Sequence, residues 1–205
     1  MALISVPLTA ETTNTSIEQD YLTVSDVFSI GWIAVTELSL SLATLLLIDH
    51  VPMRLEKAAS IGAVPINSMD SDPVQHILAY EPGGVIRAVD AVSMEAITAN
   101  GTMQQNIVLN QMVELVAAGG EFGQIGTYLA QTNAGLAPNA ERITPEASFP
   151  SPNPETVAGE LVTLIFRGIA KPGFVASASI GIEKVPTYYG RLSNHQKLKV
   201  FINFP

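Results

Sequence analysis

Residues 43–49 read ATLLLID, a short apolar run that ends in a carboxylate. Such a run is typical of a strand buried on both faces, as in a parallel sheet. Pro52 suits the first turn of a helix, so the sequence predicts a helix in MRLEKAASIGA, residues 53–63. Gly62 lies where that helix is expected to stop. AVPIN, residues 63–67, is then predicted to be a second strand.

The same alternation continues along the middle of the chain. A helix is predicted within residues 70–85, with Gly83-Gly84 after its end. A strand, a helix and a strand are predicted to follow at residues 86–93, 106–118 and 121–130. Asp70 or Asp72 is expected near the start of the first of these helices, and Gly119-Gly120 is expected to end the second. Strands alternating with helices predict a parallel sheet with helices on its faces.

The flanking regions are less regular. Residues 1–16 are rich in Thr and are expected to form an extended or frayed arm. Residues 17–38 carry a helical stripe interrupted at Gly31, and the proline-rich stretch 132–154 is predicted to be an irregular loop. A helix, a strand, a short helix and a last strand are predicted at residues 155–168, 174–182, 183–194 and 197–204.

Composition excludes several classes of function. The 205 residues include 10 Lys and Arg against 19 Asp and Glu, a net charge of −9, which does not suit nucleic-acid binding. Hydrophobic residues make up 47%, enough for a core. The absence of cysteine excludes a disulfide framework, a thiolate zinc site and a Cys nucleophile.

The run from Ile30 to Ile48 has the length of a membrane span and one charge, Glu37. Its Ser and Thr residues dilute the hydrophobicity, and Asp26 and Asp49 flank it. We therefore interpret the run as buried elements laid end to end in a cytoplasmic protein, with a membrane-anchored interaction protein as an alternative.

Asp49 is the most informative single position, because an acid at the end of the second strand of a doubly wound fold binds ribose hydroxyls. A carboxylate there favours NAD over NADP, whereas a helix-capping role is equally open. The expected G-x-G-x-x-G pattern occurs nowhere in the chain. The glycine-rich run 119–126 has a different spacing, and two interpretations stay open: a strand with close backbone approaches, or backbone lining a cofactor.

Four segments together resemble the zinc-type medium-chain alcohol dehydrogenases, in the fungal-type, glutathione-independent formaldehyde dehydrogenase-like branch. They are IDHVPMRLEKAASIGAVPIN, DPVQHILAYEPGGVIRAVDAVSMEA, NQMVELVAAGGEFGQIGTY and the C-terminal FVASASIGIEKVPTYYGRLSNHQKLKVFINF. The resemblance covers residues 17–205. It implies an α/β fold, namely a truncated Rossmann-like, doubly wound parallel sheet for NAD, followed by the C-terminal segment of the family.

The resemblance also implies roles for individual residues. Asp49 corresponds to the ribose-binding acid, and Arg54 to a basic residue near the adenine. Asp26 resembles the acid that replaces the third zinc-ligand cysteine in this branch. The remaining implied cofactor-binding residues follow the third and fourth strands: Val92, Ser93, Gln124, Ile125 and Gly126.

The chain departs from the family pattern at three places. The other catalytic zinc ligands have no counterpart, and the first strand, glycine loop and following helix are missing between Glu37 and Leu45. A shorter gap falls near residues 149–154, at the family's dimer edge. We therefore expect a truncated, inactive relative with weakened or lost NAD and zinc binding and an impaired homodimer. An active NAD-dependent alcohol or aldehyde oxidoreductase is the alternative.

Overall fold

The computed structural model describes residues 15–24, 28–29, 31–32, 44–125 and 154–204. The chain divides into two compact units. The central unit is Gly31–Pro152, and the terminal unit combines Met1–Ile30 with Asn153–Pro205.

The central unit begins with a strand–helix–strand element. Strand β1 (Leu46–Asp49), helix α3 (Pro52–Ser60) and strand β2 (Val64–Asn67) follow one another, and β1 and β2 pair in parallel. The prediction of two strands around this helix is confirmed. Gly62 adopts a φ of +90° just after the helix, and its N–H donates to the carbonyl of Ala59, as expected for a glycine stop.

Helix α4 (Pro73–Tyr80) leads to the second pair of strands. The side chain of Asp72 accepts a hydrogen bond from the N–H of Val74 at 2.9 Å, so Asp72 rather than Asp70 caps the helix. Gly84 follows with a φ of +84°. A Cβ at Gly84 would lie 2.5 Å from the carbonyl oxygen of Leu115, so only glycine fits this turn.

The second pair joins strand β3 (Val85–Asp90) to strand β4 (Val116–Gln124), again in parallel, through the short 3₁₀ turn Ser93–Glu95 and helix α5 (Ile107–Leu115). The prediction that this helix runs to residue 118 and stops at Gly119-Gly120 is wrong. The helix ends at Leu115, and the backbone is already extended at Val116, with φ −76° and ψ 125°.

The glycines at 119 and 120 belong to strand β4, and not to a helix stop. Gly119 has a φ of +80°, and a Cβ on Gly120 would lie 2.6 Å from the carbonyl oxygen of Ile86. The pairing register shifts at this point, between Val85 and Arg87. The interpretation of the run as a strand with close backbone approaches is therefore confirmed for Gly120.

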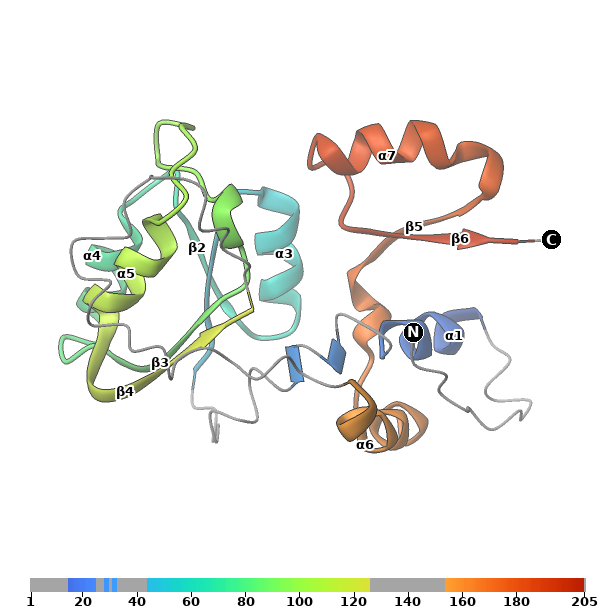
Figure 1. The fold of residues 1–205 in the computed structure, drawn as a ribbon, viewed down its shortest axis with the longest axis horizontal. Coiled ribbons are helices and arrows are strands. Elements are labelled where there is room, and N and C mark those ends of the chain that lie inside the picture. The colour runs from blue at the N-terminus through green and yellow to red at the C-terminus, as the bar shows by residue number, and fades with distance from the viewer. Residues whose placement is uncertain (1–14, 25–27, 30, 33–43, 126–153, 205) are drawn as a thin grey trace. The chain divides into compact units, whose positions relative to one another are not determined.

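One core serves both strand pairs of the central unit. Ile66 of β2, Val74 and Ile77 of α4 and Leu115 of α5 form a buried cluster. Partly buried side chains from both pairs pack against it: Leu46, Ile48, Leu78 and Val85. Helices α4 and α5 lie on one side of the strands and α3 on the other (Figure 1).

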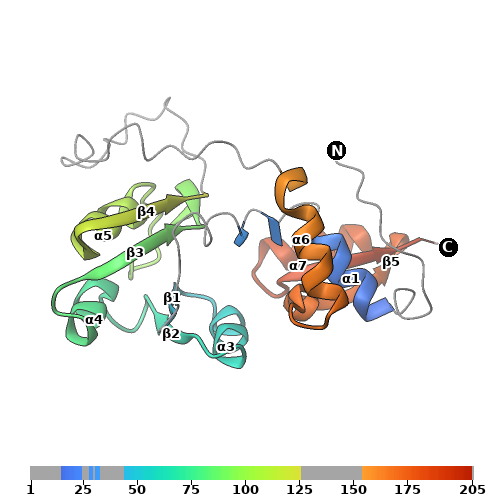
Figure 2. The ribbon, with the colours of Figure 1, turned by 90° about the horizontal axis from the view of Figure 1, so that it is seen from below.

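Parallel pairing with helices on both sides confirms the α/β class and an incomplete Rossmann-like arrangement. The strands described form separate two-stranded pairs and not one continuous sheet, as Figure 2 shows for the central unit. This outcome is one of those expected when the central first strand of a doubly wound sheet is missing.

The terminal unit contains the third parallel pair, β5 (Ala176–Gly181) and β6 (Lys199–Asn203), connected through helix α7 (Val185–Ser193). Helix α1 (Thr15–Thr23) contacts helix α6 (Pro154–Phe166) and the 3₁₀ turn η4 (Pro172–Val175). These elements match the predicted order, although α1 begins within the expected arm. Residues 1–14 and most of the predicted loop 132–154 lie outside the described residues.

Within the described part of the chain, no helix is both long and apolar enough to cross a membrane. Of the apolar run 30–48, residues 46–48 belong to strand β1, as the interpretation by successive elements expects, but they are half-buried and not fully buried. Residues 30 and 33–43 lie outside the described residues.

Candidate functional site

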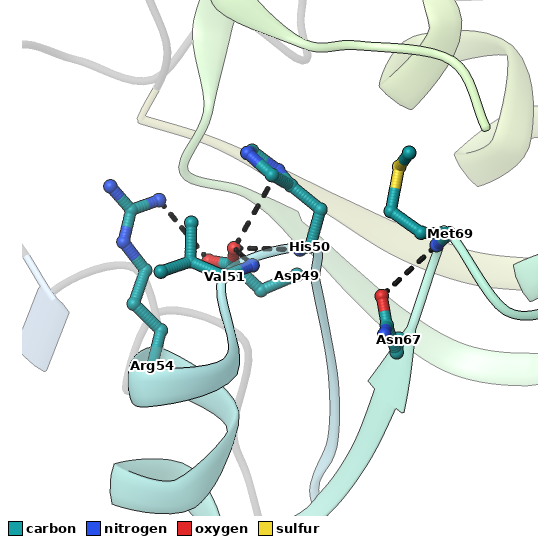
Figure 3. Close-up of polar contacts among 6 residues, drawn as sticks. All are labelled: Asp49, His50, Val51, Arg54, Asn67 and Met69. Carbon is teal, nitrogen blue, oxygen red and sulfur yellow. Dashed lines mark hydrogen bonds and ion pairs between the residues drawn. The ribbon is translucent and has the colours of Figure 1, made fainter. Parts of the chain in front are cut away.

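The carboxyl ends of β1 and β2 bring polar side chains together (Figure 3). Asp49 ends β1 and Asn67 ends β2, and the two residues are partners in the parallel register. Ligands of open α/β sheets bind outside the carboxyl ends of the strands. A ligand of the central unit is therefore expected at this edge.

Asp49 is held by three short contacts. Its Oδ1 accepts hydrogen bonds from the N–H groups of His50 at 2.7 Å and Val51 at 2.8 Å. Its Oδ2 accepts one from Nη1 of Arg54 at 3.3 Å. The fold thus brings together Asp49 and Arg54, two residues that the sequence proposed for one site.

The remaining acceptor capacity of Asp49 decides what it can do. An ionised carboxylate offers about four acceptor positions, and the contacts above use three. One position on Oδ2 stays open to a hydroxyl donor. The side chain is 16% exposed, so it is partly sheltered from water but reachable. The capping interpretation is satisfied by the same contacts, because Asp49 orders the turn into α3.

Two neighbours of Asp49 were not among the predicted site residues. His50 places its Nδ1 3.7 Å from Asp49 Oδ1, and its side chain is 28% exposed. Asn67 accepts a hydrogen bond from the N–H of Met69 at 3.0 Å (Figure 3). It also donates one to Asp70 at 2.9 Å. The sequence feature that points to Asn67 is its position, because it is the polar residue that ends an apolar strand.

A second aspartate, Asp90, ends β3 and also binds the turn that follows it, through N–H groups one residue further along the chain than at Asp49. Oδ1 of Asp90 accepts hydrogen bonds from the N–H groups of Val92 at 2.9 Å and Ser93 at 3.2 Å. Asp90 is completely buried. Ser93 adopts a φ of 68°, a left-handed conformation that is uncommon for a residue other than glycine. Sequence reasoning placed Val92 and Ser93 after this strand but gave Asp90 no role.

Gln124 and Ile125 lie at the end of β4, beside the end of β3. Gln124 is the register partner of Asp90, and the N–H of Ile125 donates to the carbonyl of Asp90 at 2.8 Å. Asp90 therefore joins the predicted loop of Val92 and Ser93 to the predicted strand end. The other two predicted residues, Gly126 and Asp26, lie outside the described residues.

The described residues do not fit a zinc ion. No group of three or more His, Cys, Asp or Glu side chains lies close enough together in that part of the chain to hold a metal. The whole sequence lacks cysteine, the thiolate ligand on which zinc sites most often draw. No zinc-dependent step is derived for this chain.

A partly buried polar contact joins two elements of the terminal unit. The N–H of Gly173 in η4 donates to Oδ1 of Asp20 in α1 at 2.5 Å. A Cβ at Gly173 would lie 2.6 Å from that oxygen, so a larger residue there would displace the Asp20 carboxyl group. Desolvation raises the pKa of Asp20 above its usual range, while the Gly173 hydrogen bond and the charge of Lys171 oppose the rise.

Comparison with known proteins locates the fold. No protein-family model matches the sequence, and no curated protein is similar enough to match it. Among solved structures, the alcohol dehydrogenase TADH from Thermus sp. ATN1 is similar at a TM-score of 0.72 and 20% identity, over 90% of this chain and 58% of that one. Benzyl alcohol dehydrogenase from Acinetobacter calcoaceticus gives 0.63 and 22%, over 86% and 46%.

A third similar structure is an alcohol dehydrogenase from E. coli CFT073, complexed with the cofactor NADH, at a TM-score of 0.62 and 17% identity over 85% and 49% of the two chains. This chain spans about half the length of the structures it matches. The fold is therefore an incomplete Rossmann-like α/β fold of the kind found in alcohol dehydrogenases.

Proposed function

We propose that the central unit binds the adenosine half of NAD at the carboxyl end of β1, without turning over an alcohol. The supporting observation is the Asp49–Arg54 pair, positioned at the strand end by the turn into α3. In this proposal the chain is a truncated, inactive relative of the zinc-type medium-chain dehydrogenases, in the formaldehyde dehydrogenase-like branch.

The open acceptor position of Asp49 suits a ribose hydroxyl. Oδ1 is filled by two backbone donors, so the incoming hydroxyl donates to Oδ2, next to Arg54. The Arg54 side chain is 41% exposed and can lie against the adenine face while it keeps its contact with Asp49. A 2′-phosphate at the same place would meet the Asp49 carboxylate, so NAD is favoured over NADP.

The missing glycine loop limits the affinity. In a complete Rossmann fold the pyrophosphate binds at a helix N-terminus that follows a glycine-rich turn. The sequence contains no G-x-G-x-x-G pattern to supply that turn. Binding then depends on the adenosine half alone, and we expect ADP-ribose and NAD to bind with similar, weak affinity.

Calorimetric titration tests the binding half of this proposal. NAD and ADP-ribose should bind more tightly than NADP. Asp49→Asn should weaken NAD and ADP-ribose, because the amide loses the charge and the Oδ2 acceptor. The same substitution should narrow their advantage over NADP, because the 2′-phosphate no longer meets a carboxylate. Glu81→Gln is the matched control, since it removes one exposed acidic charge from the same unit. Equal affinity of the Asp49→Asn variant and the unsubstituted protein for NAD would reject the site.

An absorbance assay for NADH tests the catalytic half. Ethanol or formaldehyde with NAD should give no turnover, with or without added zinc. A zinc-dependent rate that disappears in Asp26→Ala would instead establish the active oxidoreductase. The two assays separate the outcomes, because NAD binding without turnover supports the proposal and turnover contradicts it.

A further inference from the structure

Within the described residues, strand β1 pairs along one edge only, with β2. The N–H of Val64 donates to Leu45 at 2.8 Å, and the N–H of Ser68 donates to Asp49 at 3.1 Å. In a parallel pair, alternate residues point their backbone groups to the same side. The backbone groups of Leu46 and Ile48 therefore point away from β2.

Strand β3 shows the same arrangement. Its last residue, Asp90, bonds to β4 through Ile125. By alternation Ala88 also points toward β4, whereas the backbone groups of Arg87 and Val89 point away from it. Among the residues that the structure describes, no strand pairs with either outer edge.

The outer edges of β1 and β3 border one core. Leu46 and Ile48 of β1 and Val85 of β3 all pack against the buried cluster around Ile66. In doubly wound sheets of strand order 3-2-1-4-5, the first strand lies between the two pairs that correspond to β2–β1 and β3–β4. One further strand placed there would satisfy both edges at once.

The surface beside these edges is apolar. Ile86 is 67% exposed and Val89 39% exposed, both on β3. A strand in a central position of a parallel sheet is buried on both faces and is therefore a continuous apolar run. The segment that fits between β1 and β3 is a short stretch rich in Val and Ile.

The acidic charge of the central unit favours basic residues beside that segment. Its described residues 44–125 carry nine acidic and three basic side chains. Asp70 and Asp72 are exposed just beyond the carboxyl end of β2. Basic residues following the apolar stretch would lie at the same edge of the strands as these carboxylates if the segment runs parallel to its neighbours.

We propose that the central unit is a strand acceptor. It binds an extended segment of a partner polypeptide, apolar over the length of β1 and followed by Lys or Arg, in parallel between β1 and β3. Backbone hydrogen bonds to Leu46, Ile48 and Val89 supply the affinity, and the apolar side chains and basic flank supply the specificity. This inference is independent of the nucleotide proposal.

A pair of labelled peptides tests the orientation and the charge. The probe is Ser-Val-Ile-Val-Val-Gly-Lys-Lys, and its control is the same composition in reverse order, with the lysines first. Fluorescence anisotropy should give an affinity about tenfold higher for the probe, a difference of about 1.4 kcal/mol. Equal binding of the two peptides, or no binding, would overturn the proposal.

Hydrogen exchange locates the bound peptide. The outward N–H groups of Leu46, Ile48 and Val89 should exchange quickly in the free protein and become protected by the probe. The N–H of Leu47 points toward β2 and serves as an internal reference. If the three outward groups are already protected in the free protein, the edges are filled by the chain itself and the proposal fails.

Two substitutions at Val89 distinguish the contribution of its backbone N–H from that of its side chain. Val89→Pro removes the outward donor without removing a β3–β4 hydrogen bond and should lower probe affinity about tenfold or more. Val89→Ala keeps the donor and should stay within about threefold. Thermal unfolding verifies that both variants fold. Probe binding should persist in Asp49→Asn, so failure of the nucleotide site leaves this test intact.

Discussion

Asp49 and Asp90 end two strands of the same unit and bind the following turn in a similar way, in different surroundings. Each carboxyl group accepts hydrogen bonds from two backbone N–H groups of the following turn. Asp49 is 16% exposed and adds Arg54, whereas Asp90 is completely buried. Because both carboxyl groups make such contacts with a turn, these contacts do not distinguish a binding residue from a structural one.

Solvent access makes the difference between the two carboxyl groups. A buried acceptor that loses its donors, or a buried donor that loses its acceptor, carries the full cost of desolvation. Asp90 is therefore expected to contribute mainly to stability. Asp49 keeps an open acceptor position at the surface, and its main contribution is expected in ligand binding. Substitution at each position tests this division.

The largest effect is expected for Asp90→Ala. It leaves the N–H groups of Val92 and Ser93 without their acceptor and should lower the free energy of unfolding by about 2–4 kcal/mol. Urea unfolding followed by circular dichroism measures the loss. Asp90→Asn keeps the Oδ1 acceptor and should recover most of it. A loss below about 0.5 kcal/mol for Asp90→Ala would remove the structural role.

The second-largest loss of stability is expected for a substitution at Gly120, in strand β4. Gly120→Ala places a methyl group against the carbonyl oxygen of Ile86 and should cost about 1–3 kcal/mol. Gly159→Ala is the matched control, because a Cβ there meets no atom within 4 Å and the position is helical. The control should raise stability by about 0.5–1 kcal/mol. Equal effects of the two substitutions would contradict the close approach.

A smaller effect on stability is expected at Asp49. Asp49→Ala removes the acceptor for the N–H groups of His50 and Val51 near the surface, where water replaces it, and should cost about 1 kcal/mol. The same urea titration measures it beside Asp90→Ala. A cost for Asp49→Ala as large as that for Asp90→Ala would erase the distinction drawn between the two carboxyl groups.

The smallest effect is a pH dependence in the terminal unit. Because burial raises the pKa of Asp20, the folded state binds its proton more tightly than the unfolded state. The free energy of unfolding should therefore fall as the pH rises from the usual aspartate range through the raised pKa, and then level off. Asp20→Asn should flatten this part of the pH profile.

Urea unfolding at a series of pH values measures the Asp20 profile. Glu18→Gln is the control, because Glu18 lies on the same helix and is exposed. That substitution should leave the slope unchanged. A slope that survives Asp20→Asn would assign the pH dependence to another group.

Much of the fold follows from local sequence patterns. The run LLLID, Pro52 and Gly62 predict β1, α3 and its end, because each acts through its own backbone geometry. The end of α5 was missed because apolar spacing continues past Leu115 without a break. Gly120 approaches Ile86, which is far away in sequence, so the local pattern of apolar residues cannot predict this contact.

The candidate site was predictable in part, for the same reason. Asp49 and Arg54 are five residues apart, and a strand-to-helix turn brings them within 3.3 Å. The role of Asp90 depends on burial between elements that the sequence separates, so nothing local distinguishes it from Asp49. For both Asn67 and Asp90, the sequence feature that indicates a candidate site residue is a polar side chain at the end of an apolar strand.

Thermal unfolding of the protein and of Asp49→Ala, with and without NAD, tests the central claim most directly. A ligand at a hundred times its dissociation constant stabilises the native state by about 2.7 kcal/mol. The account predicts one cooperative transition that NAD shifts upward in the unsubstituted protein and leaves unshifted in Asp49→Ala. An equal shift in both proteins, or no shift in either, would contradict nucleotide binding at Asp49.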